Sequence, residues 1–259
     1  MASMLERILA AHRAAAAADP RPVAELAERA AAAPPSRGFR ASLVGPGLSV
    51  VAEVKRRSPS AGPLAPDLVP GELARSYQAG GASALSVLTD AEFFGGSAAD
   101  LSQAHDACEL PVLRKDFTVS EADVYDARLM GADAVLLIVA ALSDAELARF
   151  RALAAGLSMD ALVEVHTDVE LDRALAAGAD LVGVNRRDLQ TFTVDADVAE
   201  RLAARIPEGV VTVAESGVRN AADAATLAAC GYSAVLVGET LVTAADAAAA
   251  LVELRGPEL

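Results

Sequence analysis

Short apolar runs alternate with amphipathic, alanine-rich stretches along most of the chain. Runs that are apolar at nearly every position are typical of buried parallel strands, and the stretches between them have the spacing of helices. Eight such units in about 200 residues predict a (β/α)8 barrel, an α/β fold of the TIM-barrel class. A doubly wound open sheet is the alternative, but it usually has fewer strands and a glycine-rich first turn that this chain lacks. The predicted strands are residues 49–55, 83–90, 111–116, 133–140, 160–166, 180–185, 209–216 and 233–239.

Helix boundaries support the same repeat. Ser120 and Ser143 each precede a helical pattern with acidic residues in its first turn, so we expect them to be N-caps. Four strands are entered through related turns, "AGGAS", "LMGAD", "AAGAD" and "ACGYS". Glycine in these turns fits the left-handed conformation that ends many helices.

Residues 1–48 precede the repeat and have a different pattern. Two helices are predicted, "MLERILAAHRAAAA" and "PVAELAERAAAA", followed by the turn-rich "PPSRGF" and "GPG". We therefore expect a single domain, with an N-terminal helical extension over 1–48 and a barrel over 49–259. From sequence, the extension has three possible roles: covering the barrel, forming an interface, or closing over a substrate.

Composition narrows the function classes. The chain has 259 residues, 53% of them hydrophobic, and a formal net charge of −14. This charge argues against binding to nucleic acid or to an anionic membrane surface. No apolar run approaches the ~20 residues of a membrane helix, and no signal peptide is evident. Cys108 and Cys230 have no metal-binding spacing. These features predict a cytoplasmic protein with reduced thiols.

Lysine is rare in this chain. Of 22 basic residues, only Lys55 and Lys115 are lysines, and both lie near the ends of predicted strands. A desolvated lysine can release its proton near neutral pH, whereas arginine effectively cannot. The two lysines are therefore candidates for proton transfer.

Other polar residues also follow the predicted strands. Because barrel enzymes place their active sites at the C-terminal ends of the strands, this collection predicts a functional site there. The strand-end residues are Glu53, Lys55, Lys115, Asp116, Glu164, His166, Asn185, Arg187, Glu215, Ser216, Gly238 and Glu239. After the last two strands, "AESG" and "VGE" put small residues where barrels frequently bind phosphate. Ser216 supplies a hydroxyl, and Gly217 and Gly238 permit close backbone approach.

Five segments carry a resemblance to a known family. "EVKRRSPSAG", "VLRKDF", "LVEVH", "GVNRRDL" and "VAESGV" resemble, in order and spacing, indole-3-glycerol-phosphate synthase of tryptophan biosynthesis. The resemblance implies decarboxylation and ring closure of 1-(2-carboxyphenylamino)-1-deoxyribulose 5-phosphate to indole-3-glycerol phosphate, CO2 and water. It implies a lyase that uses no metal and no organic cofactor, with this phosphorylated small molecule as its partner.

The resemblance also implies roles for individual residues. Lys115 is expected to be the acid for ring closure, Glu164 the base and Lys55 the acid for dehydration, although the two lysines are interchangeable at this stage. The remaining polar positions of the catalytic site are Glu53, Asn185 and Glu215. Substrate-binding positions are Ser58, Pro59, Phe94, Phe117, Leu136, Ile138, Arg187 and Leu189, of which Ser58 and Arg187 match positions near the anthranilate carboxylate. Phosphate-binding positions are Ser216, Gly217, Gly238 and Glu239.

Three positions depart from the family pattern. Arg186 stands where many members have asparagine, Glu239 where others have serine, and Asp123 at a loop position where glutamine is expected. Two alternatives to the synthase are another phosphate-sugar barrel, such as phosphoribosylanthranilate isomerase, and a non-catalytic barrel that only binds phosphate. The isomerase would need a Cys/Asp pair, but both cysteines are predicted on helices. The binding barrel would not need the two lysines. We expect a monomer or a weak homo-oligomer.

Overall fold

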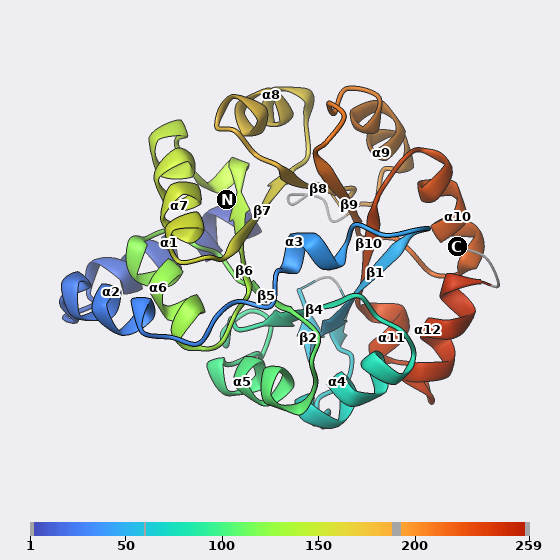
Figure 1. The fold of residues 1–259 in the computed structure, drawn as a ribbon, viewed down its shortest axis with the longest axis horizontal. Coiled ribbons are helices and arrows are strands. Elements are labelled where there is room, and N and C mark those ends of the chain that lie inside the picture. The colour runs from blue at the N-terminus through green and yellow to red at the C-terminus, as the bar shows by residue number, and fades with distance from the viewer. Residues whose placement is uncertain (1–2, 60, 188–192, 257–259) are drawn as a thin grey trace.

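Eight parallel strands close into a barrel surrounded by helices, as predicted (Figure 1). The computed structural model describes residues 3–59, 61–187 and 193–256. Strand β1 pairs with both β4 and β10, which closes the sheet. The barrel strands are β1 (Ser49–Val54), β4 (Ala84–Leu88), β5 (Val112–Lys115), β6 (Ala134–Ile138), β7 (Asp160–Val165), β8 (Leu181–Asn185), β9 (Val211–Glu215) and β10 (Ala234–Val237).

The outer layer consists of helices that follow the strands in sequence. These are α4 (Pro70–Ala79), α5 (Ala98–Ala107), α6 (Glu121–Leu129), α7 (Asp144–Gly156), α8 (Asp168–Ala176), α9 (Ala196–Ala203), α10 (Ala221–Ala229) and α12 (Ala247–Arg255). Shorter elements lie in the loops: β2 (Arg57–Ser58), β3 (Gly62–Pro63), the 3-10 helix η1 (Val139–Ala141) and α11 (Glu239–Val242). None of these short elements was predicted, because two to four residues are too few to show a periodicity.

The predicted helix boundaries are confirmed. Ser120 and Ser143 both form capping boxes, with Asp123 and Glu146 respectively, so orphan N–H groups at the helix starts are satisfied. Each of the four related turns has a glycine in the left-handed conformation, with φ between 77° and 94°; these are Gly81, Gly131, Gly178 and Gly231. Side chains other than glycine rarely adopt this conformation, which explains why the turn repeats.

Alternation along the strands separates two apolar layers. On β1, Val50, Ala52 and Val54 pack against the surrounding helices, whereas Val51 belongs to the layer inside the barrel. Because side chains two apart share a face, Glu53 and Lys55 continue the inward row toward the C-terminal end. The apolar interior therefore gives way to charged residues at that end.

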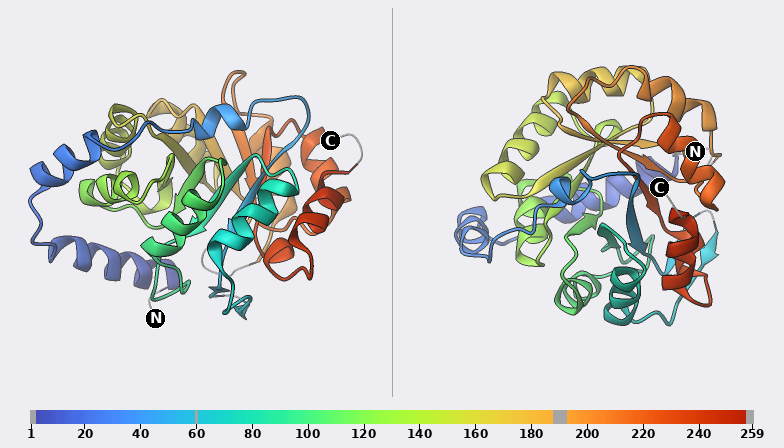
Figure 2. Two further views of the ribbon diagram at one scale, coloured as in Figure 1. Left: turned by 60° about the horizontal axis from the view of Figure 1, so that its bottom comes forward. Right: turned by 45° about the vertical axis from the view of Figure 1, so that its right-hand side comes forward.

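The N-terminal segment reaches both ends of the barrel. Helix α1 (Met4–Ala17) lies at one end and α3 (Phe39–Ser42) at the other, with α2 (Val23–Ala31) between them along the side (Figure 2). Leu26 and Ala30 of α2 pack against Tyr125 of α6. The first two helices were predicted, and α3 was not.

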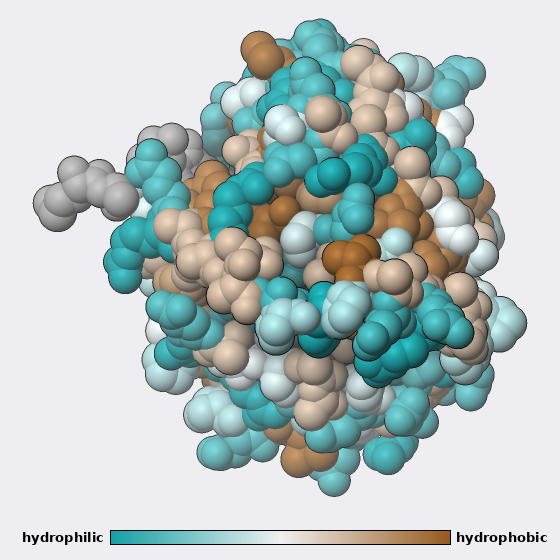
Figure 3. Space-filling model, turned by 90° about the vertical axis from the view of Figure 1, so that its left-hand side faces the viewer, coloured by the Kyte–Doolittle hydropathy of each residue, from teal (hydrophilic) through white to brown (hydrophobic). Residues whose placement is uncertain are grey.

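The side of the molecule formed by α1, α2, α6 and α7 is shown in Figure 3. Hydrophilic residues predominate there, and hydrophobic ones are scattered or recessed among them (Figure 3). Large exposed hydrophobic side chains of the described residues, such as Val23 and Val169, occur singly along the chain. Among the described residues, none of the helices combines the length and apolar character that a membrane span requires.

Candidate active site

The C-terminal ends of the strands surround one cavity of about 760 Å³. Every described residue that was predicted for catalysis, substrate binding or phosphate binding lines it; Leu189 lies outside the described residues. The predicted residues on its wall are Glu53, Lys55, Ser58, Pro59, Phe94, Lys115, Phe117, Leu136, Ile138, Glu164, Asn185, Arg187, Glu215, Ser216, Gly217, Gly238 and Glu239. They come from all eight strands or from the loops that follow them.

Lys115 occupies the centre of a charged cluster. Its Nζ lies 2.7 Å from Glu164 Oε2 on β7 and 2.9 Å from Glu215 Oε2 on β9. The side chains of both glutamates are 2% exposed and that of Lys115 is 13% exposed. Lys115, Glu164 and Glu215 meet because each occupies the last inward position of its strand.

The pKa values of the two glutamates in this cluster shift in opposite directions. Burial alone would raise the pKa of Glu164, but Lys115 and then His166 outweigh it and lower that pKa to about 2. Burial raises the pKa of Glu215, and this effect is larger than the lowering by the charge of Lys115. The negative charge of Glu164 raises the pKa as well, and its value becomes about 7. Burial alone would lower the pKa of Lys115. The negative charges of Glu164, Glu215 and Glu53 outweigh burial and raise this pKa above its ordinary value. Near neutral pH the site therefore holds a charged lysine, one carboxylate and one carboxyl that is titrating.

Lys55 and Glu53 form a second ion pair on β1 and the residue after it. Lys55 Nζ lies 2.5 Å from Glu53 Oε2, and the Lys55 side chain is 17% exposed. Gly238 faces this pair: a Cβ at that position would lie 2.3 Å from Glu53 Oε2 and 2.8 Å from Lys55 Nζ. A larger residue after β10 would thus displace the pair. Gly183 has the same relation to Glu215, with 2.3 Å from its virtual Cβ to Glu215 Oε1.

Polar groups after β8 and β9 are linked to one another. Register places Asn185 beside Glu215 on the neighbouring strand. The Ser216 hydroxyl donates to Asn185 Oδ1 at 2.9 Å, and the Arg187 N–H donates to the same oxygen at 3.0 Å. Ser216 and Gly217 are both left-handed, with φ of 66° and 77°, so the chain turns sharply at the loop predicted to bind phosphate.

Arg186, noted as a departure from the family pattern, is a structural part of that turn. Its side chain donates through Nε to the Ser216 carbonyl at 2.9 Å, and its Nη2 contacts the same oxygen. Burial lowers the pKa of Arg186. Arg186 also lines the cavity, so it adds a cation near the turn that sequence reasoning did not assign to the site. Glu239, the second departure, is an exposed residue at the start of α11. Asp123, the third, forms the capping box with Ser120 at the start of α6.

The opposite side of the cavity is apolar. Phe94 and Phe117 lie with ring centroids 6.4 Å apart, and Leu136 and Ile138 of β6 complete the wall. Met4, Leu5 and Ile8 of α1 also line the cavity, which the sequence analysis did not predict. The spacing of these three residues on one helix face was a usable signal, but nothing in the sequence indicated where that face docks.

The remaining candidate residues lie beside the cavity or away from it. His166 Nε2 lies 3.4 Å from Glu164 Oε1, while its Nδ1 contacts Glu170 at 3.1 Å. Cys108 and Cys230 follow α5 and α10 as their C-cap residues, so they end helices instead of lying within them, and neither lines the cavity. This placement gives no support to a Cys/Asp isomerase site.

Comparison with known proteins places these features in a family. A family model described as "Indole-3-glycerol phosphate synthase" matches residues 5–254. Indole-3-glycerol phosphate synthase 2 of Streptomyces coelicolor is 57% identical over 223 residues, which is 86% of each chain. The synthase of Micrococcus luteus is 55% identical over 226 residues, covering 85% of this chain and 84% of the relative. That of Mycobacterium ulcerans is 49% identical over 255 residues, covering 98% and 94%.

Solved structures of more distant proteins share the fold. Thiamine phosphate pyrophosphorylase from Pyrococcus furiosus superimposes with a TM-score of 0.62 at 18% identity, covering 84% of this chain and 96% of that one. A 3-hexulose-6-phosphate synthase gives 0.61 at 18% identity, covering 80% and 98%. At this identity the likeness concerns the barrel alone.

Proposed function

The chain belongs to the indole-3-glycerol phosphate synthase family, and on that premise we propose which of its residues carry out each step. The enzyme is a decarboxylating carbon–carbon lyase of tryptophan biosynthesis. It converts 1-(2-carboxyphenylamino)-1-deoxyribulose 5-phosphate into indole-3-glycerol phosphate, CO2 and water. The observation that carries the assignment is the position of Lys115 between Glu164 and Glu215, next to an apolar wall.

Ring closure needs an acid at the ribulose carbonyl. The aryl carbon that bears the carboxylate attacks the carbonyl carbon, a C–C bond forms, and the carbonyl oxygen becomes an alkoxide. Carboxylates around Lys115 keep it protonated, so it enters the reaction as an ammonium that stabilises this charge. An alkoxide is basic enough to take a proton even from such an ammonium. Lys115 therefore acts as the acid of this step.

Decarboxylation and dehydration follow. The C–C bond to the carboxylate breaks, CO2 leaves, and the electron pair restores the aromatic ring. Glu164, held ionised by Lys115, then takes a proton from the new five-membered ring while Lys55 protonates the departing hydroxyl. Lys115 and Lys55 each give one proton to the substrate and Glu164 takes one from it. The reaction therefore consumes one proton, which comes from solvent. Glu53 orients Lys55 through their 2.5 Å contact.

The two walls of the cavity divide the substrate between them. We assign the anthranilate ring to the apolar side, against Phe94, Phe117, Leu136 and Ile138, with Leu189 and Pro59 retained as predicted neighbours. Ser58 and Arg187 are assigned to the anthranilate carboxylate. The sharp turn at Ser216 and Gly217, together with Gly238 and the N–H of Glu239, is assigned to the phosphate, with Arg186 as an added cation.

The physical setting of the enzyme is a further part of the proposal. We take residues 1–48 as an N-terminal extension of a single barrel domain that continues to residue 259. The enzyme would work in the cytoplasm as a monomer or weak homo-oligomer, without nucleic-acid or membrane partners. Sedimentation of the purified chain over a range of concentrations tests the oligomeric state.

Turnover measured with the purified chain tests the residue roles. Product is followed by indole fluorescence after addition of the carboxyphenylamino-deoxyribulose phosphate in the presence of EDTA. We expect turnover by the wild type and a loss of at least about 10³-fold for Lys115→Ala. Tight binding of substrate without product would contradict the catalytic assignment and favour a barrel that only binds phosphate.

A further inference from the structure

Helix α1 presents one continuous face to the barrel mouth. Met4, Ile8 and His12 follow one another at intervals of one turn, and Leu5 lies three residues before Ile8, so the four side chains share this face. Ile8 is buried, and Met4 and Leu5 pack against the apolar cluster that contains Phe117, Leu136 and Ile138. The first three residues line the cavity, whereas His12, the polar member of the row, lies beyond it.

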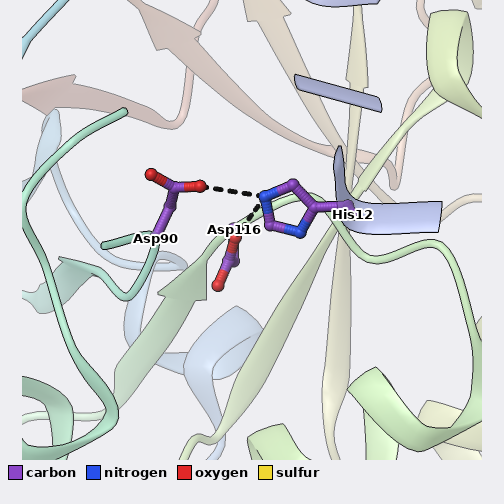
Figure 4. A group of neighbouring side chains, drawn as sticks. All are labelled: His12, Asp90 and Asp116. Carbon is purple, nitrogen blue, oxygen red and sulfur yellow. Dashed lines mark hydrogen bonds and ion pairs between the residues drawn. The ribbon is translucent and has the colours of Figure 1, made fainter. Parts of the chain in front are cut away.

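His12 contacts two aspartates from neighbouring barrel loops. Its Nε2 lies 2.9 Å from Asp90 Oδ2, after β4, and 3.8 Å from Asp116 Oδ1, after β5 (Figure 4). Both aspartate side chains are 4% exposed and the histidine side chain is 19% exposed. The imidazole also packs at 5.5 Å from the Phe117 ring. One side chain therefore joins α1 to two loops.

Those loops carry the phenylalanines of the apolar wall. Asp90 Oδ1 accepts hydrogen bonds from the N–H groups of Phe93 at 2.6 Å and Phe94 at 3.0 Å. Asp116 Oδ1 accepts from the Phe117 N–H at 2.8 Å. The aspartates that fix the phenylalanine backbone are thus the same groups that hold His12.

The charges of the two aspartates are balanced differently. Asp116 Oδ2 accepts from Arg114 at 2.9 Å and from the Thr89 hydroxyl at 2.5 Å. For Asp90, the cationic partner within the described part of the chain is His12. A positive charge on His12 therefore completes the pairing, and the imidazole needs that charge to act as an ion-pair partner.

We propose that His12 is a positioning residue whose imidazolium bridges Asp90 and Asp116 and thereby holds α1 as the apolar cover of the substrate-ring pocket. This inference rests on the assignment of that pocket to the anthranilate ring. Arg13 provides the other polar anchor of α1, by contacts with Glu146 of α7 and the Ala141 carbonyl after β6, the strand next to β5. Both anchors lie in the second half of α1, and the first half of the helix, with Met4, Leu5 and Ile8, lies over the cavity.

The electrostatic surroundings favour the charged imidazole. The hydrogen bond to Asp90 raises the pKa of His12, burial opposes this, and the charges of Asp116, Asp90 and Asp123 raise it further. The nearby cations are already paired, Arg114 with Asp116 and Arg13 with Glu146. As pH rises through this raised pKa, His12 loses its charge and the ion pairs weaken to at most a neutral hydrogen bond.

The same three residues also have the composition of a cation site, since their ligand atoms lie within 4.8 Å of one another. The hydrogen-bond pattern favours the ion pair. Backbone N–H groups occupy an oxygen of each aspartate, and Arg114 places a positive charge 2.9 Å from Asp116. A metal ion would have to compete with that charge, so we include chelation in the test.

Steady-state kinetics of His12→Ala and His12→Gln tests the proposal. At about pH 6 we expect KM to rise about five- to tenfold while kcat stays within about twofold, because the cover binds substrate and transition state alike. The difference from wild type should shrink as pH is raised toward about 9, because wild-type His12 loses its charge as pH rises through its raised pKa. Arg13→Gln is the matched control: it should raise KM equally at both pH values. An unchanged KM, or a fall in kcat without a change in KM, would overturn the proposal.

Two further measurements separate the possible failures. With three histidines in the chain, His12 can be assigned by NMR from His12→Gln, and we expect its pKa above the ordinary 6.5. A value below 6.5, or a shift in KM on adding EDTA, would overturn the ion-pair bridge. Phe94→Ala tests the ring pocket itself. If Phe94→Ala raises KM and His12→Ala does not, the bridge is wrong and the pocket assignment stands; if neither raises KM, both are wrong.

Discussion

Both ends of this barrel contain charged side chains, but the two ends differ in how these side chains are paired. At the N-terminal ends of the strands, Asp133 and Arg40 have backbone partners. Asp133 accepts from the N–H groups of Arg37 at 2.7 Å and Val112 at 2.8 Å, and the Arg40 side chain donates to the carbonyls of Asp180 and Gly209. Phe39 and Leu43 belong to the apolar cluster inside the barrel.

At the C-terminal ends, charges face one another instead. Lys115 is shared between Glu164 and Glu215, and Glu215 Oε1 is buried without a hydrogen-bond partner among the described residues. Such an arrangement costs stability because buried polar groups are left incompletely paired. The difference indicates that the first end stabilises the fold, whereas the second holds groups ready for substrate. Substitutions should therefore divide by end into those that change stability and those that change activity.

The largest effect is expected at the catalytic end. Glu164→Gln removes the proposed base but keeps the size of the side chain, so kcat should fall about 10²- to 10⁴-fold. The thermal midpoint should move by only a few degrees, since the amide can still contact Lys115. Indole fluorescence and thermal melts measure the two quantities. A comparable loss of stability would remove the contrast between the ends.

At the opposite end, Phe39→Ala should show the reverse pattern. The ring is fully buried, and its truncation leaves a cavity inside the barrel. We expect a loss of about 3–5 kcal/mol in the free energy of unfolding, measured by denaturant titration. The kcat of the folded fraction at low temperature should match that of wild type. A large drop in kcat would mean that α3 also affects the reacting groups.

The ionisation of Glu215 should make the free energy of unfolding depend on pH. Its pKa in the folded state, about 7, exceeds its ordinary 4.5, so the protonated form is favoured by folding. The contribution is fully present below about pH 4.5 and is lost as pH rises to about 7. Relative to Glu215→Gln, the wild type should lose up to about 3 kcal/mol of unfolding free energy between these values. Denaturant titrations of both proteins at pH 5 and pH 8 provide the test, and parallel changes would contradict it.

A smaller effect is expected from Asp133→Ala at the N-terminal end. This change leaves the buried N–H of Val112 and the half-buried N–H of Arg37 without their acceptor, which should cost about 1–3 kcal/mol of unfolding free energy. The kinetic constants should not change. Asp133→Asn serves as the control because its carbonyl oxygen can accept one of the two bonds. Equal stability of wild type and Asp133→Ala would show that water replaces the carboxylate.

The sequence predicted the catalytic end better than its opposite. Barrel strands repeat a local pattern, and the last inward position of each strand can be counted, so the sequence alone predicts Lys115, Glu164 and Glu215. The four-residue helix α3 has no such period. The bridge between His12 and Asp90 joins residues 78 positions apart, and only the folded chain brings them together. Arg186 was recognised only as a departure, because its partner is a backbone carbonyl.

The central claim is that Lys115 gives a proton to the substrate and does not act only as a positive charge. Lys115→Arg tests this most directly, because arginine keeps the charge but does not release a proton in this pH range. We predict that single-turnover indole formation falls by at least about 10³-fold while substrate affinity stays within about tenfold of wild type. Turnover by Lys115→Arg within about tenfold of wild type would show that charge alone suffices and would contradict the account.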